Sequence, residues 1–366
     1  MSRYERPNIR AMHGYTWGEQ PQDGRTIKLN TNENPYPVSP AVQAALQSID
    51  VAALRTYPQP TADALRDAIA AHHAVSRNNV IVTNGGDEAL RLAMTTFVEP
   101  GSSFGMAEPS YSLYPVLAAI HDAGVVEVPL QHDWSMPEDF AARLNETAAQ
   151  LACVVNPHAP SGTLYDVDAL RRIAVEFDGV LLIDEAYADF IDEGNPYDSA
   201  PLINELDNVL ILRTFSKGYS LAGLRLGYLL GSDALIDPML SKTRDSYNID
   251  HLSQVLGLAA LEDNAYARET WTNVRSERSR LSNDLAQMGL TSPPSQSNFI
   301  LARIPPDAGV SAEQVYERLK ASGILVRYFA APGLADRLRI TVGTPQQNDA
   351  LTKALLEILQ PHAAPD

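Results

Sequence analysis

The sequence contains a single cysteine, Cys153, among its 366 residues, so no disulfide can form within the chain. This fits a reducing compartment, and we expect a cytoplasmic protein. Cys153 lies in the apolar run 151–155, which predicts a buried strand residue rather than a nucleophile. The first fifteen residues lack the apolar core of a signal peptide, and no apolar run approaches the length of a membrane span.

Positive charge is also scarce. The chain has 28 lysines and arginines against 45 aspartates and glutamates, which leaves a net charge of -17 at pH 7. Nucleic acid and anionic membranes attract basic faces, so neither is an expected partner. A phosphorylated small molecule is not excluded, because a few arginines in a cleft reverse the local field. We therefore expect a small-molecule ligand, and we predict no metal site.

The middle of the chain consists of short apolar runs that alternate with helical patterns. Its length predicts two domains. Unbroken apolar runs suit strands that are buried on both faces, which indicates an α/β fold with a mostly parallel sheet under helices. The predicted strands are 80–83, 125–128, 151–155, 180–183 and 209–212, and the residues after Gly86 predict a helix.

The two ends of the chain have a different pattern. Residues 1–45 are rich in proline and asparagine and predict an arm. From residue 262 a long charged helical stretch is followed by apolar runs at 298–301, 323–327 and 338–342, which is an α+β pattern. We therefore predict a large domain over 46–261 and a second unit made of 1–45 and 262–366, which contains the arm and a smaller C-terminal domain.

Ligands of a doubly wound sheet bind beyond the carboxyl ends of its strands, so the residues after each run are the candidates. Gly85, Gly86, Asp87 and Glu88 follow the first strand and begin a helix, whose free N–H groups suit a phosphate. A tight turn capped by Asp87 is the alternative.

Asp184 follows the strand 180–183. A carboxylate there suits a protonated pyridine nitrogen, which keeps such a ring an electron sink. A metal ligand and a helix cap are the alternatives.

Lys217 follows the strand 209–212. A lysine with a lowered pKa forms a Schiff base with an aldehyde. Thr214, Ser216 and Arg225 lie close by in sequence and suit a phosphate. The alternative is a solvated loop lysine.

Taken together, GGDE at 85–88, DEAY at 184–187 and RTFSKGYSLAGLRLGY at 213–228 resemble the fold-type I pyridoxal-phosphate enzymes. Within these, the chain is most similar to the histidinol-phosphate aminotransferases. The match begins at LNTNENPY (29–36), close to the family's LNxNENPY. It continues through 57–58, 109–111, 247–248 and 297–299 and ends at 339–343, so it covers nearly the whole chain.

The resemblance implies a seven-stranded sheet, pyridoxal 5'-phosphate as cofactor and a homodimer. Lys217 would hold the cofactor and shuttle the proton, Asp184 would pair with the ring nitrogen, and Tyr187 would bond the phenolate oxygen. Tyr111 would stack on the ring. The implied cofactor-binding set is Gly86, Asp87, Glu88, Tyr111, Asn156, Asp184, Tyr187, Thr214, Ser216, Lys217 and Arg225, with Tyr57 reaching the neighbouring subunit's phosphate.

The implied substrate-binding residues are Tyr36, Asn34, Arg327, Arg339 and Tyr247. Arg339 would bind the α-carboxylate of glutamate, and Arg327 the substrate phosphate. Arg337 competes with Arg339 for that role. Both predicted arginines have a surface ion pair as the alternative, and Tyr57, Tyr111 and Tyr187 have ordinary aromatic packing.

One position departs from the family. Where the family reads NPNNPTG, residues 156–162 read NPHAPSG, so Ala159 replaces the asparagine that bonds the phenolate oxygen. Either Asn156 supplies an amide or Tyr187 acts alone. His158 either faces the cofactor or, as is commoner for a loop histidine, faces solvent. We expect the loss of this donor to change the acid–base behaviour of the cofactor more than the fold.

The implied reaction is a ping-pong transamination in histidine biosynthesis, which interconverts histidinol phosphate and 2-oxoglutarate with imidazole acetol phosphate and glutamate. An aromatic amino-acid aminotransferase and a threonine-phosphate decarboxylase are alternatives on the same scaffold. A regulator that senses the cofactor is a third alternative. It would need a basic DNA-binding domain, which the acidic sequence does not favour.

Overall fold

The computed structural model describes residues 2–359. A seven-stranded sheet has the order β2-β8-β7-β6-β5-β3-β4. Neighbouring strands are parallel except around β8, which runs antiparallel to both β2 and β7. The strands are β2 (Val80–Thr83), β3 (Ser103–Glu108), β4 (Gly124–Pro129), β5 (Ala149–Val155), β6 (Val180–Asp184), β7 (Val209–Thr214) and β8 (Gly227–Gly231). The mostly parallel sheet and the α/β class are confirmed.

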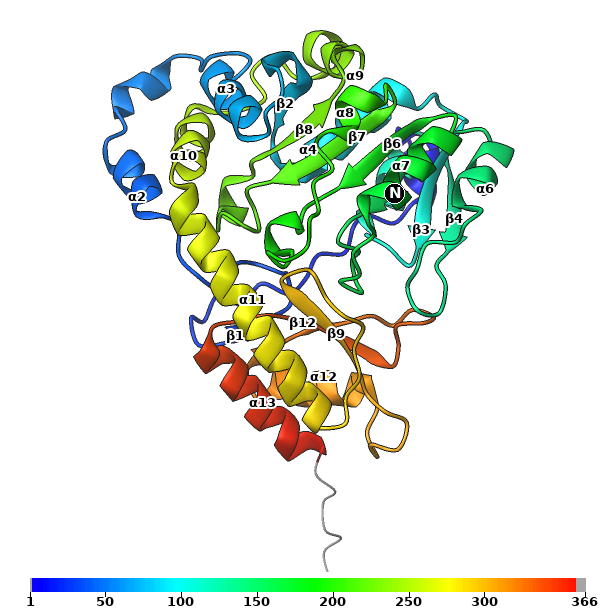
Figure 1. Cartoon of the computed structure of the whole chain (residues 1–366), viewed down its shortest axis with the longest axis vertical. Helices are drawn as coiled ribbons and strands as arrows, with labels where there is room; N and C mark the ends of the chain where they lie inside the picture. Colours follow the sequence, from blue (N-terminus) through cyan, green and yellow to red (C-terminus); the bar gives the residue numbers. More distant parts are fainter. Residues whose placement is uncertain (1, 360–366) are drawn as a thin grey trace, which may run out of the picture.

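Helices cover both faces of this sheet because successive strand residues point to opposite sides (Figure 1). In β6, Leu181 and Ile183 join one apolar core, whereas Leu182 joins the other. The first core packs against α3 (Asp63–His72), α6 (Phe140–Glu146), α7 (Val167–Glu176), α8 (Leu202–Glu205) and α10 (His251–Glu262). The second packs against α4 (Gly85–Phe97), α5 (Leu113–Ile120), α9 (Asp233–Pro238) and the π-helix η5 (Met239–Thr243).

Two strands of the sheet, β3 and β8, have no counterpart among the runs predicted from apolar sequence. Gly105 interrupts β3, and a Cβ at this position would lie 2.5 Å from Leu144 Cδ2. Glycines bound β8, and a Cβ on Gly231 would lie 2.6 Å from Leu210 Cδ2. These glycines allow close packing over the sheet, and they also break the apolar pattern that identifies a strand.

The C-terminal part has its own core. Strands β9 (Phe299–Arg303), β11 (Arg327–Tyr328) and β12 (Arg337–Thr341) form an antiparallel sheet of order β11-β12-β9. Beside it, β1 (Ile27–Lys28) pairs in parallel with β10 (Ile324–Leu325). Helices α12 (Ala312–Ala321) and α13 (Pro345–Leu359) pack on these strands around Leu319, Leu338 and Leu351.

One long helix, α11 (Asn264–Gln287), runs from the large sheet to the small one beside α13 (Figure 1). Its first half contributes Trp271 and Val274 to the large core, and its second half contributes Leu281 and Leu285 to the small core. The helix is therefore a physical connection between the two cores.

The predicted domain boundaries stay a prediction. The boundary at 261/262 lies at the end of α10. The boundary at 45/46 falls inside α2 (Pro40–Gln47), whose Val42 packs in the large core. The first strand of the arm, β1, pairs instead with the C-terminal β10.

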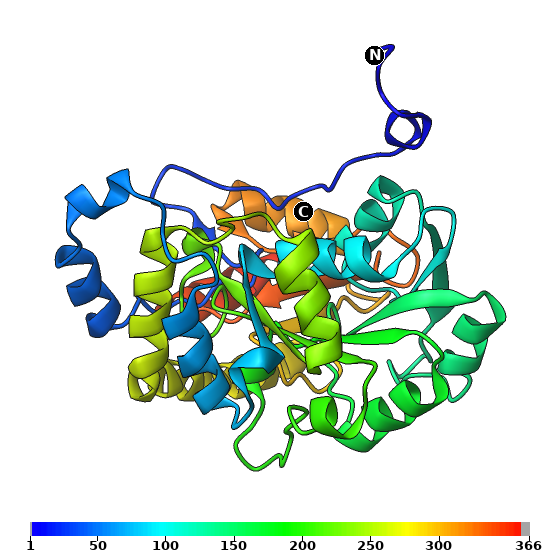
Figure 2. The same ribbon diagram turned by 90° about the horizontal axis from the view of Figure 1, so that it is seen from above.

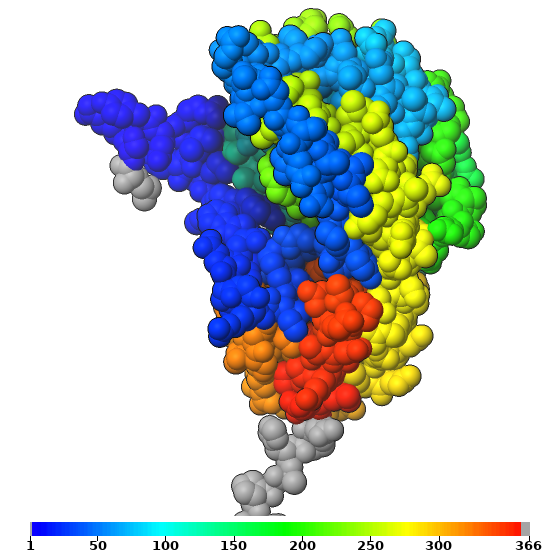
Figure 3. Space-filling view, turned by 90° about the vertical axis from the view of Figure 1, so that its left-hand side faces the viewer, coloured from blue at the N-terminus to red at the C-terminus, as the bar shows by residue number. Residues whose placement is uncertain are grey.

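The start of the arm, with α1 (Pro7–Ala11), projects from the body (Figures 2 and 3). Asn8 Nδ2 donates to Ala119 O at 2.9 Å and Arg6 Nη2 to Ile120 O at 2.8 Å, so α1 is attached to the end of α5. Tyr4 and Trp17 of this segment are mostly exposed.

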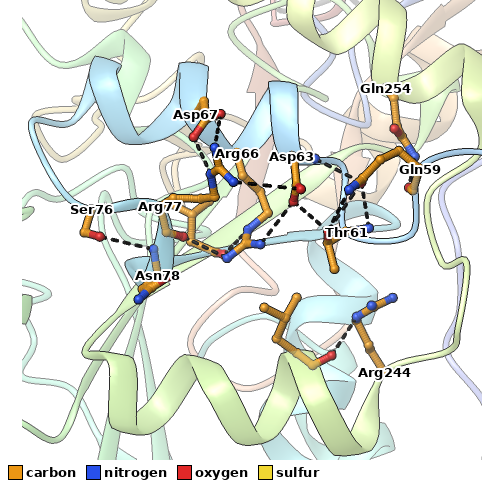
Figure 4. A network of polar contacts seen from close by, with 12 residues as sticks. Gln59, Thr61, Asp63, Arg66, Asp67, Ser76, Arg77, Asn78, Arg244 and Gln254 are labelled. Carbon is orange, nitrogen blue, oxygen red and sulfur yellow. Dashed lines mark hydrogen bonds and ion pairs between the residues drawn. The ribbon is translucent and has the colours of Figure 1, made fainter.

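Short 3₁₀ turns join the larger elements: η1 (Val51–Arg55), η2 (Arg77–Asn79), η3 (Ala188–Phe190) and η4 (Ala222–Leu224). Helix α3 is fixed to the edge of the large sheet by Arg66, whose Nε donates to Val80 O at 2.8 Å and whose Nη2 donates to Arg77 O at 2.9 Å. Figure 4 shows this network, with Gln254 of α10 donating to Gln59 O at 2.9 Å at its other end.

Candidate functional site

The polar residues predicted to act together follow neighbouring strands at one edge of the large sheet. Strands β5, β6 and β7 are parallel neighbours and end at Val155, Asp184 and Thr214. Backbone bonds hold the ends together, because Asn156 N donates to Asp184 O and Glu185 N donates to Leu212 O. This is the edge at which a doubly wound sheet binds ligands.

Lys217 lies in the loop after β7 with its amine buried. Its Nζ donates to the carbonyl oxygen of Thr31, in the arm, at 2.8 Å. Burial and the nearby cations Arg339, Arg225 and Lys28 lower the pKa of Lys217 to about 8, although Glu33 opposes them. The amine is therefore available in its neutral, nucleophilic form near physiological pH.

The loop that carries Lys217 is held from several sides. Trp271 Nε1 and Asn34 Nδ2 both donate to Gly218 O, at 2.7 and 3.1 Å. A Cβ on Gly218 would lie 2.1 Å from Asp189 Oδ2, so only glycine fits here. These contacts fix the backbone next to Lys217.

The predicted phosphate cradle is assembled around Arg225. Its guanidinium donates to Asp87 Oδ2 and to Ser216 Oγ, both at 3.3 Å. Ser216 in turn bonds Thr214 Oγ1 at 3.0 Å. Gly85, in the left-handed region (φ 72°), lies so close to Arg225 that a Cβ would be 2.7 Å from Nη2. The helix α4 begins at this point with its free N–H groups, so the arrangement suits an anion. Gly86 packs against Leu212 of β7.

Asp184 is buried at the end of β6. Its carboxylate accepts from Tyr114 Oη at 2.7 Å and from Ala186 N at 3.1 Å. Burial raises its pKa to about 6. A protonated ring nitrogen would offset this burial penalty, so the carboxylate fits the expected partner. Tyr114 was not identified from the sequence, because an aromatic residue in an apolar helix carries no sign of a buried hydroxyl partner.

Tyr187 follows β6 and is tied to the arm. Asn32 Nδ2 donates to its hydroxyl oxygen at 3.0 Å, and Lys217 Nζ lies 5.9 Å from its ring centroid. The ring packs edge-on against Phe299. Asn32 lies in the LNTNENPY motif, but its contact with Tyr187, 155 positions away, could not be predicted from that motif.

Tyr111 lies at the same site, edge-on to Tyr114 at 5.5 Å and to Tyr15 at 5.9 Å between ring centroids. Burial raises the pKa of the Tyr111 phenol well above its usual value. Tyr15 comes from the arm, and no sequence pattern singled it out.

Arg327 and Arg339 are directly opposite each other on β11 and β12, so their side chains leave the same face of the small sheet. Arg339 is partly buried, with its guanidinium carbon 5.4 Å from the ring centroid of Phe299 and 5.5 Å from that of Phe329, and among the described residues its Nη2 donates only to Asn30 O at 3.1 Å. Within residues 2–359, Arg339 Nε has no hydrogen-bond partner and neither arginine has a carboxylate at ion-pair distance. Two like charges in this position favour an anionic ligand.

Asn156 does not have the free amide that the sequence left open. Its Nδ2 donates to Tyr165 O and to Tyr197 Oη, both at 2.9 Å, and its Oδ1 accepts from Tyr165 N. Both amide hydrogens are therefore used inside the fold, and we remove Asn156 from the cofactor-binding set. Glu88 is also engaged, because it accepts from Asn84 N and from Asn248 Nδ2.

His158 is not solvent-facing, which corrects that expectation. It is 1% exposed, with Nδ1 bonded to Ser161 Oγ at 2.7 Å and Nε2 to Pro109 O at 2.9 Å. Burial lowers its pKa to about 4, so it is neutral. It links its own loop to the one that carries Tyr111. Ala159 is buried in the apolar core beside the sheet.

Tyr57 and Tyr247 stack on each other with their centroids 4.4 Å apart. Tyr57 is 80% exposed and Tyr247 44% exposed. Tyr57 also lines a cavity of about 360 Å³ with Ala53, His251 and Leu258, among others. In a single chain Tyr57 therefore faces outward.

Asn34 and Tyr36 lie where the arm meets α11. Asn34 donates to Gly218 O and to Thr270 Oγ1 and accepts from Tyr36 N, so its amide anchors the arm. Tyr36 is partly buried against the large core.

No group of His, Cys, Asp and Glu side chains among the described residues is arranged to hold a metal ion. None of the described helices combines the length and the apolar character needed to cross a membrane.

Comparison with known proteins identifies the family. The family described as aminotransferase class I and II matches residues 25–355. Histidinol-phosphate aminotransferase 1 of Trichormus variabilis is 43% identical over 361 residues, which are 98% of this chain and 100% of that protein. Histidinol-phosphate aminotransferase of Chromohalobacter salexigens is 39% identical over 97% of this chain and 99% of its own length.

Solved structures give the same result for the fold. The histidinol-phosphate aminotransferase of Sinorhizobium meliloti, in complex with pyridoxal-5'-phosphate, superposes with a TM-score of 0.88 at 27% identity over 98% of both chains. Aspartate aminotransferase of Thermus thermophilus with maleate has a TM-score of 0.77 at 22% identity over 91% of this chain and 92% of its own. This second likeness concerns the fold alone.

Proposed function

The chain belongs to the class I and II aminotransferase family, and we propose that it interconverts histidinol phosphate and 2-oxoglutarate with imidazole acetol phosphate and glutamate, using pyridoxal phosphate. It is an aminotransferase of histidine biosynthesis. The observation that supports the substrate assignment is the pair Arg327 and Arg339, of which Arg339 lies close enough to Lys217 to lower its pKa. Within the described residues, neither arginine has a carboxylate partner.

The residues present fit the cofactor. Lys217 offers a buried amine whose pKa is lowered to about 8. Asp184 offers a buried carboxylate for the ring nitrogen, and Arg225 with Ser216 offers donors for the phosphate. When bound, pyridoxal phosphate supplies an electron sink that makes the substrate Cα–H bond acidic.

Each residue then has a defined task. The Lys217 amine holds the cofactor and, once displaced by the amino substrate, accepts the Cα proton at Nζ and returns it. Asp184 would keep a proton on the ring nitrogen of the bound cofactor, because an ionised carboxylate at this position stabilises an N–H cation. Tyr111 would pack over the ring, and Tyr187 would donate to its phenolic oxygen. The cradle would hold the phosphate.

The two arginines separate the two half-reactions. Histidinol phosphate has no α-carboxylate, so Arg339 serves the glutamate half and Arg327 takes the phosphate. The nearby rings of Phe299 and Phe329 and the partial burial of Arg339 lower the local polarity, which strengthens its bond to an anion. Bidentate pairing suits a planar carboxylate.

The assembly is part of the proposal. A second copy would receive Tyr57, whose exposure leaves it free to reach a neighbouring phosphate. We also propose a division near residue 262, supported by the separate apolar cores on either side of α11. A cytoplasmic location rests on the single cysteine.

A spectral titration tests the function. Purified protein is loaded with pyridoxal phosphate, and amino donors are added one at a time while the visible band of the bound cofactor is followed. Glutamate and histidinol phosphate should bleach the band, and phenylalanine should not. Equal bleaching by phenylalanine would indicate an aromatic aminotransferase. The absence of any band that depends on Lys217 would refute the proposal.

A further inference from the structure

Asn32 occupies a position in which its two amide ends have different partners. Its backbone N–H donates to Thr341 Oγ1 at 3.0 Å, so that hydroxyl is free to donate its own hydrogen to Asn32 Oδ1, also at 3.0 Å. This assigns the oxygen end of the amide to Thr341 and turns Nδ2 toward Tyr187 Oη, 3.0 Å away. The Tyr187 oxygen therefore accepts from Asn32, and its own hydrogen must point elsewhere.

The backbone of Asn32 is held firmly enough to fix this direction. Asn32 is buried, and Asn298 Nδ2 donates to its carbonyl at 2.9 Å. Its φ of 57° is in the left-handed region, which asparagine tolerates better than most residues. The preceding residue, Thr31, accepts from Lys217 Nζ. Two adjacent arm residues thus contact the two groups proposed to act at the cofactor's reactive end.

The rest of the neighbourhood makes this contact more important in this chain. Ala159 has no side-chain donor, and both amide hydrogens of Asn156 are used elsewhere, so neither side chain can bond a phenolic oxygen. The other titratable groups that face Tyr187 are Arg339 on β12, Asp184 on β6, Tyr15 from the arm, Tyr111 and Lys217. None of these five hydrogen-bonds the Tyr187 hydroxyl.

We propose that Asn32 is a positioning residue that directs the Tyr187 hydroxyl hydrogen at the cofactor's phenolic oxygen, and that in this chain the Asn32–Tyr187 pair alone performs the task that an asparagine at position 159 would share. The inference rests on the proposed function. It assigns to the arm a part in setting the acid–base state of the loaded site.

The expected sign follows from the hydrogen bond. A donor to an oxygen stabilises the proton-free form of the group, so losing the donor raises the pKa of the loaded site. Asn32→Gly keeps the left-handed backbone and removes the amide. Asn32→Asp keeps the shape but turns the donor into an acceptor, so that Tyr187 would donate to the introduced carboxylate instead of the cofactor.

The experiment is a pH titration of the visible spectrum of each loaded variant, with the cofactor dissociation constant measured alongside. Asn32→Gly should raise the spectral pKa by about one unit, and Asn32→Asp by more. Tyr187→Phe should raise it at least as much as Asn32→Gly. Adding Asn32→Gly to Tyr187→Phe should then produce no further shift, because Asn32 acts through Tyr187. Ala159→Asn should lower the pKa by supplying a second donor.

Asn30→Ala is the matched control. Asn30 is also buried, lies two residues away, and its side chain donates to Glu19 O rather than to Tyr187, so its loss should leave the spectral pKa unchanged. The proposal is overturned if Asn32→Gly leaves the pKa unchanged, or shifts it equally with and without Tyr187. If the wild-type protein forms no Lys217-dependent band, the proposed function fails and the inference falls with it, which is a distinct result.

Discussion

The cradle around Arg225 and the pair Arg327–Arg339 are both basic, but they are built in opposite ways. Arg225 is partly exposed and already bonded to Asp87, Ser216 and a backbone carbonyl. Arg339 is partly buried, and within residues 2–359 it is bonded to one carbonyl only. An exposed, partly neutralised arginine adds geometry and modest binding energy. A less exposed arginine with unused donors adds far more binding energy when an anion arrives. The free energy of cofactor binding should therefore come from many contacts, whereas that of substrate binding should come from a few.

The largest expected effect is the loss of activity when Lys217, in the loop after β7 of the large sheet, is replaced. Lys217→Ala should lower kcat by about 10⁴-fold or more, because it removes both the covalent attachment and the proton carrier. Steady-state transamination measures this, together with the loss of the visible band. Lys320→Ala removes a surface lysine paired with Glu19 and should leave both unchanged. Activity of Lys217→Ala near the wild-type level would contradict the assignment.

The next-largest effect is expected at Arg339, where substrate binding should depend on few contacts. Arg339→Met should raise KM for glutamate by roughly 30- to 100-fold, the equivalent of about 2–3 kcal/mol for a charge-assisted bond, with cofactor affinity nearly unchanged. Arg337→Met is the matched control, since Arg337 lies on the same strand but beside its own carboxylate, Asp336. If Arg337→Met has the larger effect on KM, Arg337 is the carboxylate ligand.

A smaller effect is expected in the cradle. Arg225→Met should weaken pyridoxal-phosphate binding by about 10-fold, because α4, Thr214 and Ser216 retain their donors and solvent screens a partly exposed charge. Fluorescence titration of cofactor-free protein measures the dissociation constant. If Arg225→Met weakens cofactor binding by as large a factor as Arg339→Met raises KM for glutamate, the expected difference between the two arginines is wrong.

The smallest expected effect is a shift in the pKa of Lys217 when Arg339 is replaced. Lys217 must be neutral to bond the cofactor, so the rate of cofactor attachment should rise with pH and level off above about 8. Arg339 is one of the cations that lower this pKa, so Arg339→Met should move the midpoint to higher pH. Stopped-flow absorbance of attachment across pH values measures it. If the midpoint for Arg339→Met is unchanged or moves to lower pH, Arg339 does not lower the pKa of Lys217.

Much of the fold follows from the sequence because β5, β6 and β7 are buried on both faces and so are apolar along most of their length. β3 and β8 could not be predicted in this way, since glycines interrupt them where the neighbouring side chains approach closely. Asp184 and Thr214 end the neighbouring parallel strands β6 and β7, and Lys217 follows β7 by three residues, so all three fall at the same end of the sheet.

The parts of the site that the sequence could not supply come from contacts between distant segments. Tyr114 contacts Asp184, Asn32 contacts Tyr187, and Tyr15 contacts Tyr111, each across 70 or more positions of the chain. The sequence around these three residues does not indicate such contacts. His158 looked like a loop residue, yet its two ring nitrogens have partners in different loops. Residue type alone does not reveal such pairings.

The helix α11 has a mechanical consequence. Its 24 residues span roughly 36 Å, so a tilt of about 5° at one end displaces the other by about 3 Å. One end is seated in the small core through Leu281 and Leu285, and nearer the other end Trp271 donates to the carbonyl beside Lys217. A rocking of the C-terminal lobe would therefore be transmitted along the helix to the backbone that presents the reactive amine.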